Sequence, residues 1–167
     1  MLTDLVQIQR LGEKQRDENL RFRAWMKRHN FVERRFKAIA QGVEEAIDCT
    51  GCANCCRVAT TQINERDAEH LAKHLGMRLA DFLRDYTVVV PGEGLILKRN
   101  EDGCVFLDGN LCSVYEARPG TCSTFPHLVK GSGSLLSRMW HMPDRAVYCP
   151  IVYNTLEQFK HETGFKK

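Results

Sequence analysis

The stretch Cys49-Thr50-Gly51-Cys52-Ala53-Asn54-Cys55-Cys56 decides how this chain is organised. Two residues between successive cysteines let a tight turn bring both sulfurs to one metal ion. Repetition of that spacing places three thiolates around a common centre. Gly51 and Asn54 tolerate the unusual backbone angles that such a loop needs. The stretch therefore predicts an irregular, cysteine-rich metal core.

The other cysteines extend this core along the chain. The chain has eight cysteines, at Cys49, Cys52, Cys55, Cys56, Cys104, Cys112, Cys122 and Cys149. The N-terminus lacks the basic start and following apolar core that are typical of a secretory signal. No segment approaches the roughly 20 apolar residues of a membrane span. We therefore expect a cytoplasmic protein, in which reduced cysteines bind metal more readily than they form disulfides.

The spacing of the first cysteines favours an iron–sulfur cluster. Bacterial ferredoxins combine C-x2-C-x2-C with a remote cysteine that precedes proline, and Cys149-Pro150 offers such a remote ligand. A 4Fe-4S cluster is therefore the favoured cofactor. Zinc is the alternative, because it accepts any four convergent thiolates even though separated cysteine pairs are its usual pattern.

Cys56 raises the question of a second centre. Its side chain is expected to diverge from that of Cys55, so the two would not comfortably hold the same ion. Eight cysteines divide into two sets of four, and the co-ligands of Cys56 would then be Cys104, Cys112 and Cys122. The turn Asp108-Gly109-Asn110 predicts a hairpin that brings Cys104 close to Cys112. One centre with spare or redox-active thiols is the other interpretation, and disulfides are the third.

Outside the cysteines the pattern is mainly helical. Apolar residues recur at helical spacing through residues 1–48, which predicts two helices, or one kinked helix, with a break near His29-Asn30. Further helices are expected at about 64–75, 79–86 and 151–162. Strands are expected at 87–90, 95–98 and 105–107, and residues 135–141 can add another. The predicted fold class is α+β, mainly helical, with a small β-hairpin region and an N-terminal helical arm.

The chain is expected to fold as a single globular unit of three segments. These are an N-terminal helical arm (1–48), a cysteine-cluster metal-binding domain (49–150) and a C-terminal helix packed on it (151–167). A length of 167 residues is ordinary for one domain. The net charge of only +3 does not indicate an electrostatic field strong enough to attract nucleic acid. Residues 10–37 nevertheless carry ten Lys or Arg against four Asp or Glu. This excess predicts a solvated face or a docking surface for a protein partner, with nucleic acid as a weaker alternative and no membrane partner.

The combination of motifs resembles the CxxCxxCC family of zinc- or iron-chelating proteins, also called YkgJ-type cysteine-cluster proteins. The matching elements follow the family's order over about residues 49–150. They are the run 49–56, Gly103-Cys104-Val105-Phe106-Leu107, Cys112-Ser113-Val114-Tyr115, Arg118-Pro119-x2-Cys122, Phe125-Pro126 and Cys149-Pro150. The resemblance implies that the eight cysteines chelate zinc or iron. It implies no known reaction.

Three functions follow from these patterns. The first is an iron–sulfur protein that acts in electron transfer or as an accessory or maturation factor. The second is a zinc-binding structural or interaction module. The third is a cluster-dependent modifying enzyme, because related cysteine motifs occur in flagellin lysine methylases, although no glycine-rich strand-to-helix turn for a nucleotide-like cofactor is present. Histidines 70, 74, 127 and 141 are weaker ligand candidates, and Arg118 could stabilise an anionic cluster nearby.

Overall fold

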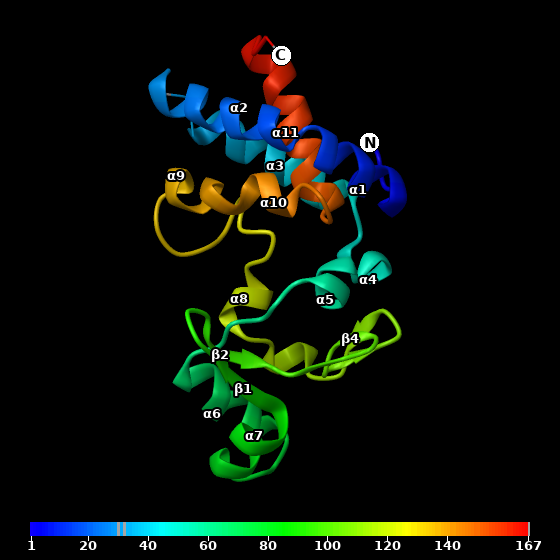
Figure 1. Ribbon diagram of the computed structural model, residues 1–167, viewed down its shortest axis with the longest axis vertical. Helices are drawn as coiled ribbons and strands as arrows, with labels where there is room; N and C mark the ends of the chain where they lie inside the picture. The colour runs from blue at the N-terminus through cyan, green and yellow to red at the C-terminus, as the bar shows by residue number, and fades with distance from the viewer. Residues whose placement is uncertain (30, 32, 167) are drawn as a thin grey trace. The chain divides into compact units, whose positions relative to one another are not determined.

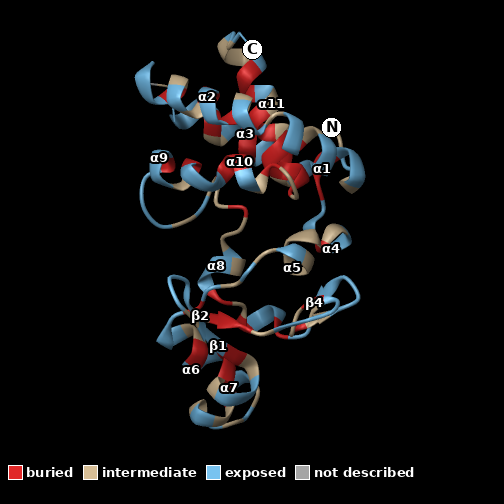
Figure 2. Ribbon diagram, viewed as in Figure 1, coloured by how far each residue is buried: buried red, intermediate tan, exposed pale blue. Residues whose placement is uncertain are grey.

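The chain divides into two compact units in a computed structural model that describes residues 1–29, 31 and 33–166. Unit 1 comprises residues 1–48 and 125–167, and unit 2 comprises residues 49–124 (Figure 1). Each unit has its own buried core, coloured red in Figure 2. The predicted class, α+β and mainly helical, is confirmed. None of the described helices is both long and apolar enough to cross a membrane.

Unit 1 consists of helices from both ends of the chain. They are α1 (Leu5–Lys14), α2 (Arg16–Arg28), α3 (Glu33–Ala46), α9 (Leu135–Arg138), the 3₁₀ turn η2 (Met139–His141), α10 (Met142–Arg145) and α11 (Pro150–Thr163). The predicted arm therefore contains an additional boundary, at Gln15. The predicted break near His29-Asn30 agrees with the end of α2, although Asn30 itself lies outside the described residues. The bounds predicted for the metal-binding domain, 49–150, include all of unit 2 and part of unit 1, and they stay a prediction.

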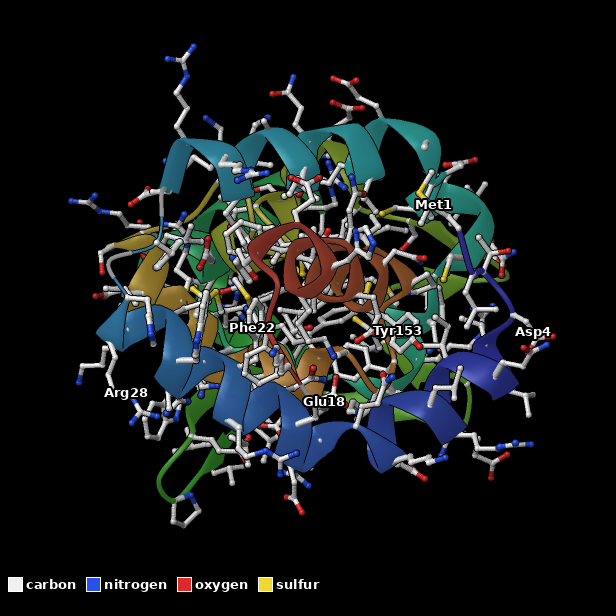
Figure 3. The ribbon with its side chains drawn as sticks, turned by 90° about the horizontal axis from the view of Figure 1, so that it is seen from above. Met1, Asp4, Glu18, Phe22, Arg28 and Tyr153 are labelled. Carbon is white, nitrogen blue, oxygen red and sulfur yellow. The ribbon has the colours of Figure 1, made fainter. Side chains whose placement is uncertain are left out.

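An aromatic cluster forms the centre of unit 1. Phe22, Phe36 and Phe159 are fully buried. The ring centroids of Phe36 and Phe159 lie 5.1 Å apart, and those of Phe22 and Phe159 lie 6.0 Å apart, both in edge-to-face geometry. Figure 3 shows Phe22 directed from α2 toward α11, with Asp4 and Arg28 at the outside. Phe22 therefore belongs to the core-facing stripe of an amphipathic helix and is not exposed for stacking on a nucleic-acid base.

A buried charge network links α11 to α2. The Lys160 side chain is 4% exposed, and its Nζ donates to Glu18 Oε1 at 2.5 Å and to Asn19 Oδ1 at 3.1 Å. Glu157 pairs with the same ammonium group. Charge-assisted hydrogen bonds of this kind satisfy the lysine in surroundings where an unpaired charge would cost several kcal/mol.

Residues 135–141 are helical, so the predicted strand was wrong. Ser134 begins α9 by accepting a hydrogen bond from the Ser137 N–H at 3.2 Å. The buried residues are Leu135, Met139 and Met142, which are spaced as on one face of a helix. The buried residues of this segment thus follow the helical period rather than the alternation of a strand.

A close backbone contact fixes α1 within unit 1. A Cβ atom on Gly12 would lie 2.6 Å from the carbonyl oxygen of Ala146 and 2.7 Å from the Val147 Cα. Such distances are shorter than any ordinary contact, so only glycine lets α1 approach the segment that follows α10 this closely.

Unit 2 carries most of the cysteines on short elements. They are α4 (Cys49–Cys52), α5 (Asn54–Val58), α6 (Glu65–His74), α7 (Leu79–Tyr86), β1 (Thr87–Val90), β2 (Gly94–Leu97), β3 (Arg99–Asn100), β4 (Gly103–Cys104), β5 (Leu107–Asp108), β6 (Leu111–Cys112), the 3₁₀ turn η1 (Tyr115–Ala117) and α8 (Gly120–Ser123). The antiparallel pairs are β1–β2, β3–β4 and β5–β6. The strand predicted at 105–107 was wrong in its bounds, because Val105 and Phe106 lie between β4 and β5.

The core of unit 2 lies between α6, α7 and the loop at Phe106. Leu71 and Phe82 are fully buried, and Tyr86 stacks on Phe106 with centroids 5.1 Å apart. Asn64 begins α6 in a capping box, accepting from the Asp67 N–H at 2.9 Å while the Asp67 side chain accepts from the Asn64 N–H. This cap explains why the helix predicted at 64–75 is found almost where expected.

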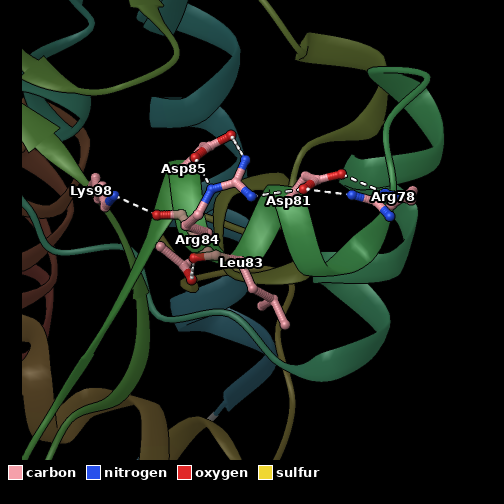
Figure 4. Close-up of polar contacts among 7 residues, drawn as sticks. Arg78, Asp81, Leu83, Arg84, Asp85 and Lys98 are labelled. Carbon is pink, nitrogen blue, oxygen red and sulfur yellow. Dashed lines mark hydrogen bonds and ion pairs between the residues drawn. The ribbon is translucent and has the colours of Figure 1, made fainter.

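Charged side chains cover the exposed face of α7 (Figure 4). Asp81 accepts hydrogen bonds from Arg78 and Arg84, which hold the pKa of its carboxyl group below the usual value. Arg84 also pairs with Asp85, and Lys98 donates to the Arg84 carbonyl oxygen at 2.6 Å. Exposed ion pairs contribute little to stability one by one, but the Lys98 contact joins the chain after β2 to α7.

Candidate metal centre

Two short helices carry the first four cysteines. They are α4 and α5, and their cysteines are Cys49, Cys52, Cys55 and Cys56. The helices meet at Ala53, whose φ of 49° lies in the left-handed region, where residues other than glycine are uncommon. Sequence reasoning assigned the unusual backbone angles to Gly51 and Asn54. Gly51 instead lies within α4 and Asn54 within α5, and nothing in the alanine side chain signals its conformation.

The two adjacent cysteines lie close together. The sulfurs of Cys55 and Cys56 are 4.0 Å apart. Two thiolates on one tetrahedral zinc ion, each at ~2.3 Å, would lie about 3.8 Å apart. The two side chains therefore diverge less than the sequence argument expected, and the contact fits a shared ion as well as two neighbouring centres.

The next three cysteines come from separate short elements. Cys104 lies in β4 and Cys112 in β6, where it pairs with Leu107 across the hairpin. Cys122 lies in α8, and its sulfur is 4.0 Å from the Thr61 hydroxyl oxygen. Short strands and a single helical turn thus hold these three sulfurs through local hydrogen bonds.

These three thiols share one electrostatic environment with Cys56. Burial raises the pKa of Cys104, of Cys112 and, to about 12, of Cys122. The charge of nearby Cys56 raises the pKa of each of the three further. The four residues that sequence analysis grouped as one set therefore lie near enough to influence each other's ionisation.

Cys56 is the member of this set that ionises most readily. Its pKa falls to about 6, first because of the hydrogen bond with Cys55 and then, against the opposing effect of burial, because of the charges of Arg57, Arg118 and Arg99. A metal binds thiolate rather than thiol. Cys56 therefore provides a thiolate near neutral pH in a partly buried position.

Arginines are the residues that sequence reasoning identified incompletely. The guanidinium of Arg118 lies 3.5 Å from the centroid of the Tyr115 ring, and its Nε donates to the Tyr115 carbonyl oxygen at 3.0 Å. Its charge acts on Cys56 and on Cys112, and its suggested role beside an anionic cluster stays a prediction. Arg99 was missed, because a single arginine before a turn gives no signal of where its side chain will reach.

Cys149 lies in unit 1 rather than with the other seven cysteines. It is 6% exposed and precedes α11, in which Pro150 is the first residue. Sequence analysis assigned Cys149 as the remote fourth ligand of Cys49, Cys52 and Cys55, and this assignment stays a prediction.

The donor set fits a thiophilic metal by its chemistry. All eight cysteines are thiols rather than disulfides. Those of unit 2 other than Cys49 are partly buried, and three guanidinium groups lie near Cys56. Among the described residues, however, no three His, Cys, Asp or Glu side chains converge closely enough to hold an ion as they stand. In the described residues the sulfurs therefore do not form a closed ion site.

The histidine candidates lie on other surfaces. His70 and His74 are exposed on α6. His127 and His141 belong to unit 1, and burial followed by the charges of nearby arginines lowers the pKa of His127 to about 4. His127 is therefore a neutral imidazole at physiological pH.

A protein-family model matches the part of the chain that contains all eight cysteines. Its description is "Putative zinc- or iron-chelating domain", its name is CxxCxxCC, and the match covers residues 48–150. Nothing matches the chain among curated proteins or among solved structures.

Proposed function

Because the chain belongs to the CxxCxxCC family, whose domain is described as zinc- or iron-chelating, we propose that its cysteines hold one or two iron–sulfur clusters. The observation that carries the proposal is the set of Cys56, Cys104, Cys112 and Cys122. These sulfurs come from four short elements of unit 2 and act on one another electrostatically. Four such thiols are the donor set of a cluster with four cysteine ligands.

The proposed ligands form two sets. Cys56, Cys104, Cys112 and Cys122 make up the first, and Cys49, Cys52, Cys55 and Cys149 the second. A bound cluster would supply reversible one-electron chemistry, or a labile iron–sulfur unit for delivery. The residues around the first set supply charge and shape, because Arg57, Arg99 and Arg118 offset the negative charge of the thiolates.

The role that follows is electron transfer, or service as an accessory factor in the maturation of another protein. The proposed partner surface is the helical arm of residues 1–48. On α2, residues Arg16, Arg21, Arg23, Lys27 and Arg28 are basic, and most of them are exposed. An exposed basic face suits an acidic protein surface through complementary charge.

Zinc is the second candidate, favoured by the architecture of unit 2. Several of its strands are two residues long, and its hydrophobic core is small. Small domains of this kind draw much of their folding free energy from structural zinc, on the order of 10 kcal/mol. The 4.0 Å separation of the Cys55 and Cys56 sulfurs is also near the spacing on one tetrahedral ion. In this case the protein would be an interaction module without redox chemistry.

Metal analysis of the full chain, purified without oxygen, tests the proposal. We expect iron and acid-labile sulfide in equal amounts and a broad absorption band that oxygen bleaches. A colourless protein with bound zinc would favour the second candidate, and a protein without iron or zinc would refute both.

Two serine variants test how the cysteines are divided. Cys56→Ser should remove only part of the iron if two centres exist, and Cys52→Ser should remove the other part. Thr60→Ser is the control, because Thr60 is exposed and has no proposed ligand role. Full iron content in both cysteine variants would overturn the assignment of the ligands.

A further inference from the structure

Arg57 joins the cysteine loop to the hairpin that carries Cys112. Its Nη1 donates to the Cys52 carbonyl oxygen at 2.9 Å, and its Nη2 donates to the Gly109 carbonyl oxygen at 2.8 Å and to the Asn110 side-chain oxygen. The Asn110 amide in turn donates to the Gly51 carbonyl oxygen at 3.1 Å. One guanidinium thus spans α4 and the turn between β5 and β6.

Arg99 makes the corresponding link for Cys104. Arg99 lies in β3, directly opposite Cys104 in β4. Its Nη1 donates to the Ala59 carbonyl oxygen at 2.5 Å, and its Nη2 donates to the Arg57 carbonyl oxygen. These carbonyl groups belong to the end of α5 and the residue after it, so the second arginine joins the β3–β4 pair to the helix that carries Cys56.

Both arginines bind carbonyl oxygens rather than carboxylates. Among the described residues, neither Arg57 nor Arg99 forms an ion pair with Asp or Glu, whereas Arg78 and Arg84 on α7 do. Their positive charge therefore stays available to the nearby sulfurs. The planar guanidinium is needed for the span, because its fork reaches several acceptors at once, while a lysine ammonium acts as a single point.

We infer that Arg57 is a positioning residue between the two proposed ligand sets, which holds Cys52 of the second set and Cys112 of the first at a fixed separation through the backbone of α4 and of the β5–β6 turn. This inference rests on the proposed function, since it concerns the same thiols. Residues that orient metal ligands without touching the metal typically change affinity by about 10- to 100-fold when they are replaced. Arg57 thus acts through other residues and is not itself a ligand.

Two substitutions separate the geometry of Arg57 from its charge. Arg57→Lys keeps the positive charge and loses the fork, and Arg57→Gln loses the charge but keeps one donor group. Arg66→Lys is the matched control, because Arg66 is an exposed residue of α6. Asn110→Ala is the second test of the same link, since it removes one acceptor of Arg57 and the donor to Gly51.

The experiment is a titration of the metal-free full chain with Co²⁺, followed by competition with Zn²⁺. We expect Arg57→Lys to weaken Co²⁺ binding by about 10- to 100-fold and to alter the visible absorption of the saturated protein, which reports the ligand geometry. Asn110→Ala should act in the same direction, and Arg66→Lys should match the wild type. If Arg57→Lys fails to fold, the Asn110→Ala result decides.

Three outcomes would overturn the inference. Arg57→Lys with wild-type affinity and spectrum would overturn it while the proposed function stands. Weaker binding with an unchanged spectrum at saturation would also overturn it, because the residue would then support only the stability of the fold. A wild-type chain that binds neither Co²⁺ nor Zn²⁺ and contains no iron would overturn the proposed function, and this inference with it.

Discussion

Replacing Gly103 with alanine should push β4 away from α5 and disturb the environment of Cys104. Gly103 has a φ of +130°, and a Cβ atom there would lie 2.5 Å from the Cys56 carbonyl oxygen and 2.7 Å from the Arg57 Cα. Both neighbours are backbone atoms, so no side-chain rotation relieves the overlap. Backbone strain of about 1–3 kcal/mol and steric overlap of about 1–3 kcal/mol together predict a loss of about 2–6 kcal/mol in the folding free energy of unit 2.

Gly92→Ala is the control that isolates the overlap. Gly92 also has a positive φ, +82°, but nothing lies within 4 Å of its Cβ position. This variant should therefore show the strain alone, about 1–3 kcal/mol. The difference between the two variants measures how closely β4 is held against the helix that carries Cys56.

Amide hydrogen exchange of the metal-free protein is the assay, because it resolves β4 and α5 from the rest of the chain. Tryptophan fluorescence in urea reports unit 1, since Trp25 and Trp140 both lie there. We expect faster exchange in β4 and α5 for Gly103→Ala than for Gly92→Ala. Equal exchange in the two variants would refute the reasoning. Metal binding by Gly103→Ala at wild-type affinity would show that the close contact between β4 and α5 is not needed for the site.

Three further predictions concern single contacts. Lys160→Met should lower the stability of unit 1 by about 3–5 kcal/mol in urea unfolding, because it removes the buried ammonium group that pairs with Glu18, whose side chain is 12% exposed; a loss below 1 kcal/mol would contradict this. The pKa of His127 is lowered to about 4, so the unfolded chain binds the extra proton between about pH 6.5 and 4 and stability should fall as pH falls through that range. His127→Asn should remove about 1–2 kcal/mol of that dependence, after allowance for solvent screening at a half-buried group, and an unchanged pH profile would contradict the assignment. Asn64→Ala should cost about 1 kcal/mol through loss of the cap on α6, seen as faster exchange at the Asp67 amide, and unchanged exchange would speak against it.

Helices with local signals at their ends could be predicted from the sequence. Asn64 and Gly164 mark the start of α6 and the end of α11 within a residue or two of the observed bounds. The boundary at Gln15 was missed because its side chain makes no capping hydrogen bond there. Without a capping side chain, the local sequence carries no signal of this boundary.

Some features of the candidate site could likewise be predicted from local sequence signals, and others could not. The turn at Asp108-Gly109-Asn110 could be predicted from the sequence and forms the expected β5–β6 hairpin, whereas the division of the cysteines into two sets stays a prediction. The contacts of Arg57 and Arg99 could not be predicted, because an arginine that donates to distant carbonyl oxygens follows no sequence period. The left-handed angle at Ala53 is also set by the surrounding chain.

The order of the two units along the chain has a consequence for biosynthesis. Unit 2 is one uninterrupted segment, whereas unit 1 is built from residues before and after it. The ribosome therefore delivers all of residues 49–124 before α11, whose Phe159 completes the packing around Phe22 and Phe36. Domains fold as units during synthesis, so seven of the eight cysteines are exposed to the cell's metal supply while unit 1 is still incomplete. Under the proposed function, metal loading of unit 2 can thus begin on the nascent chain, before Cys149 and α11 are synthesised.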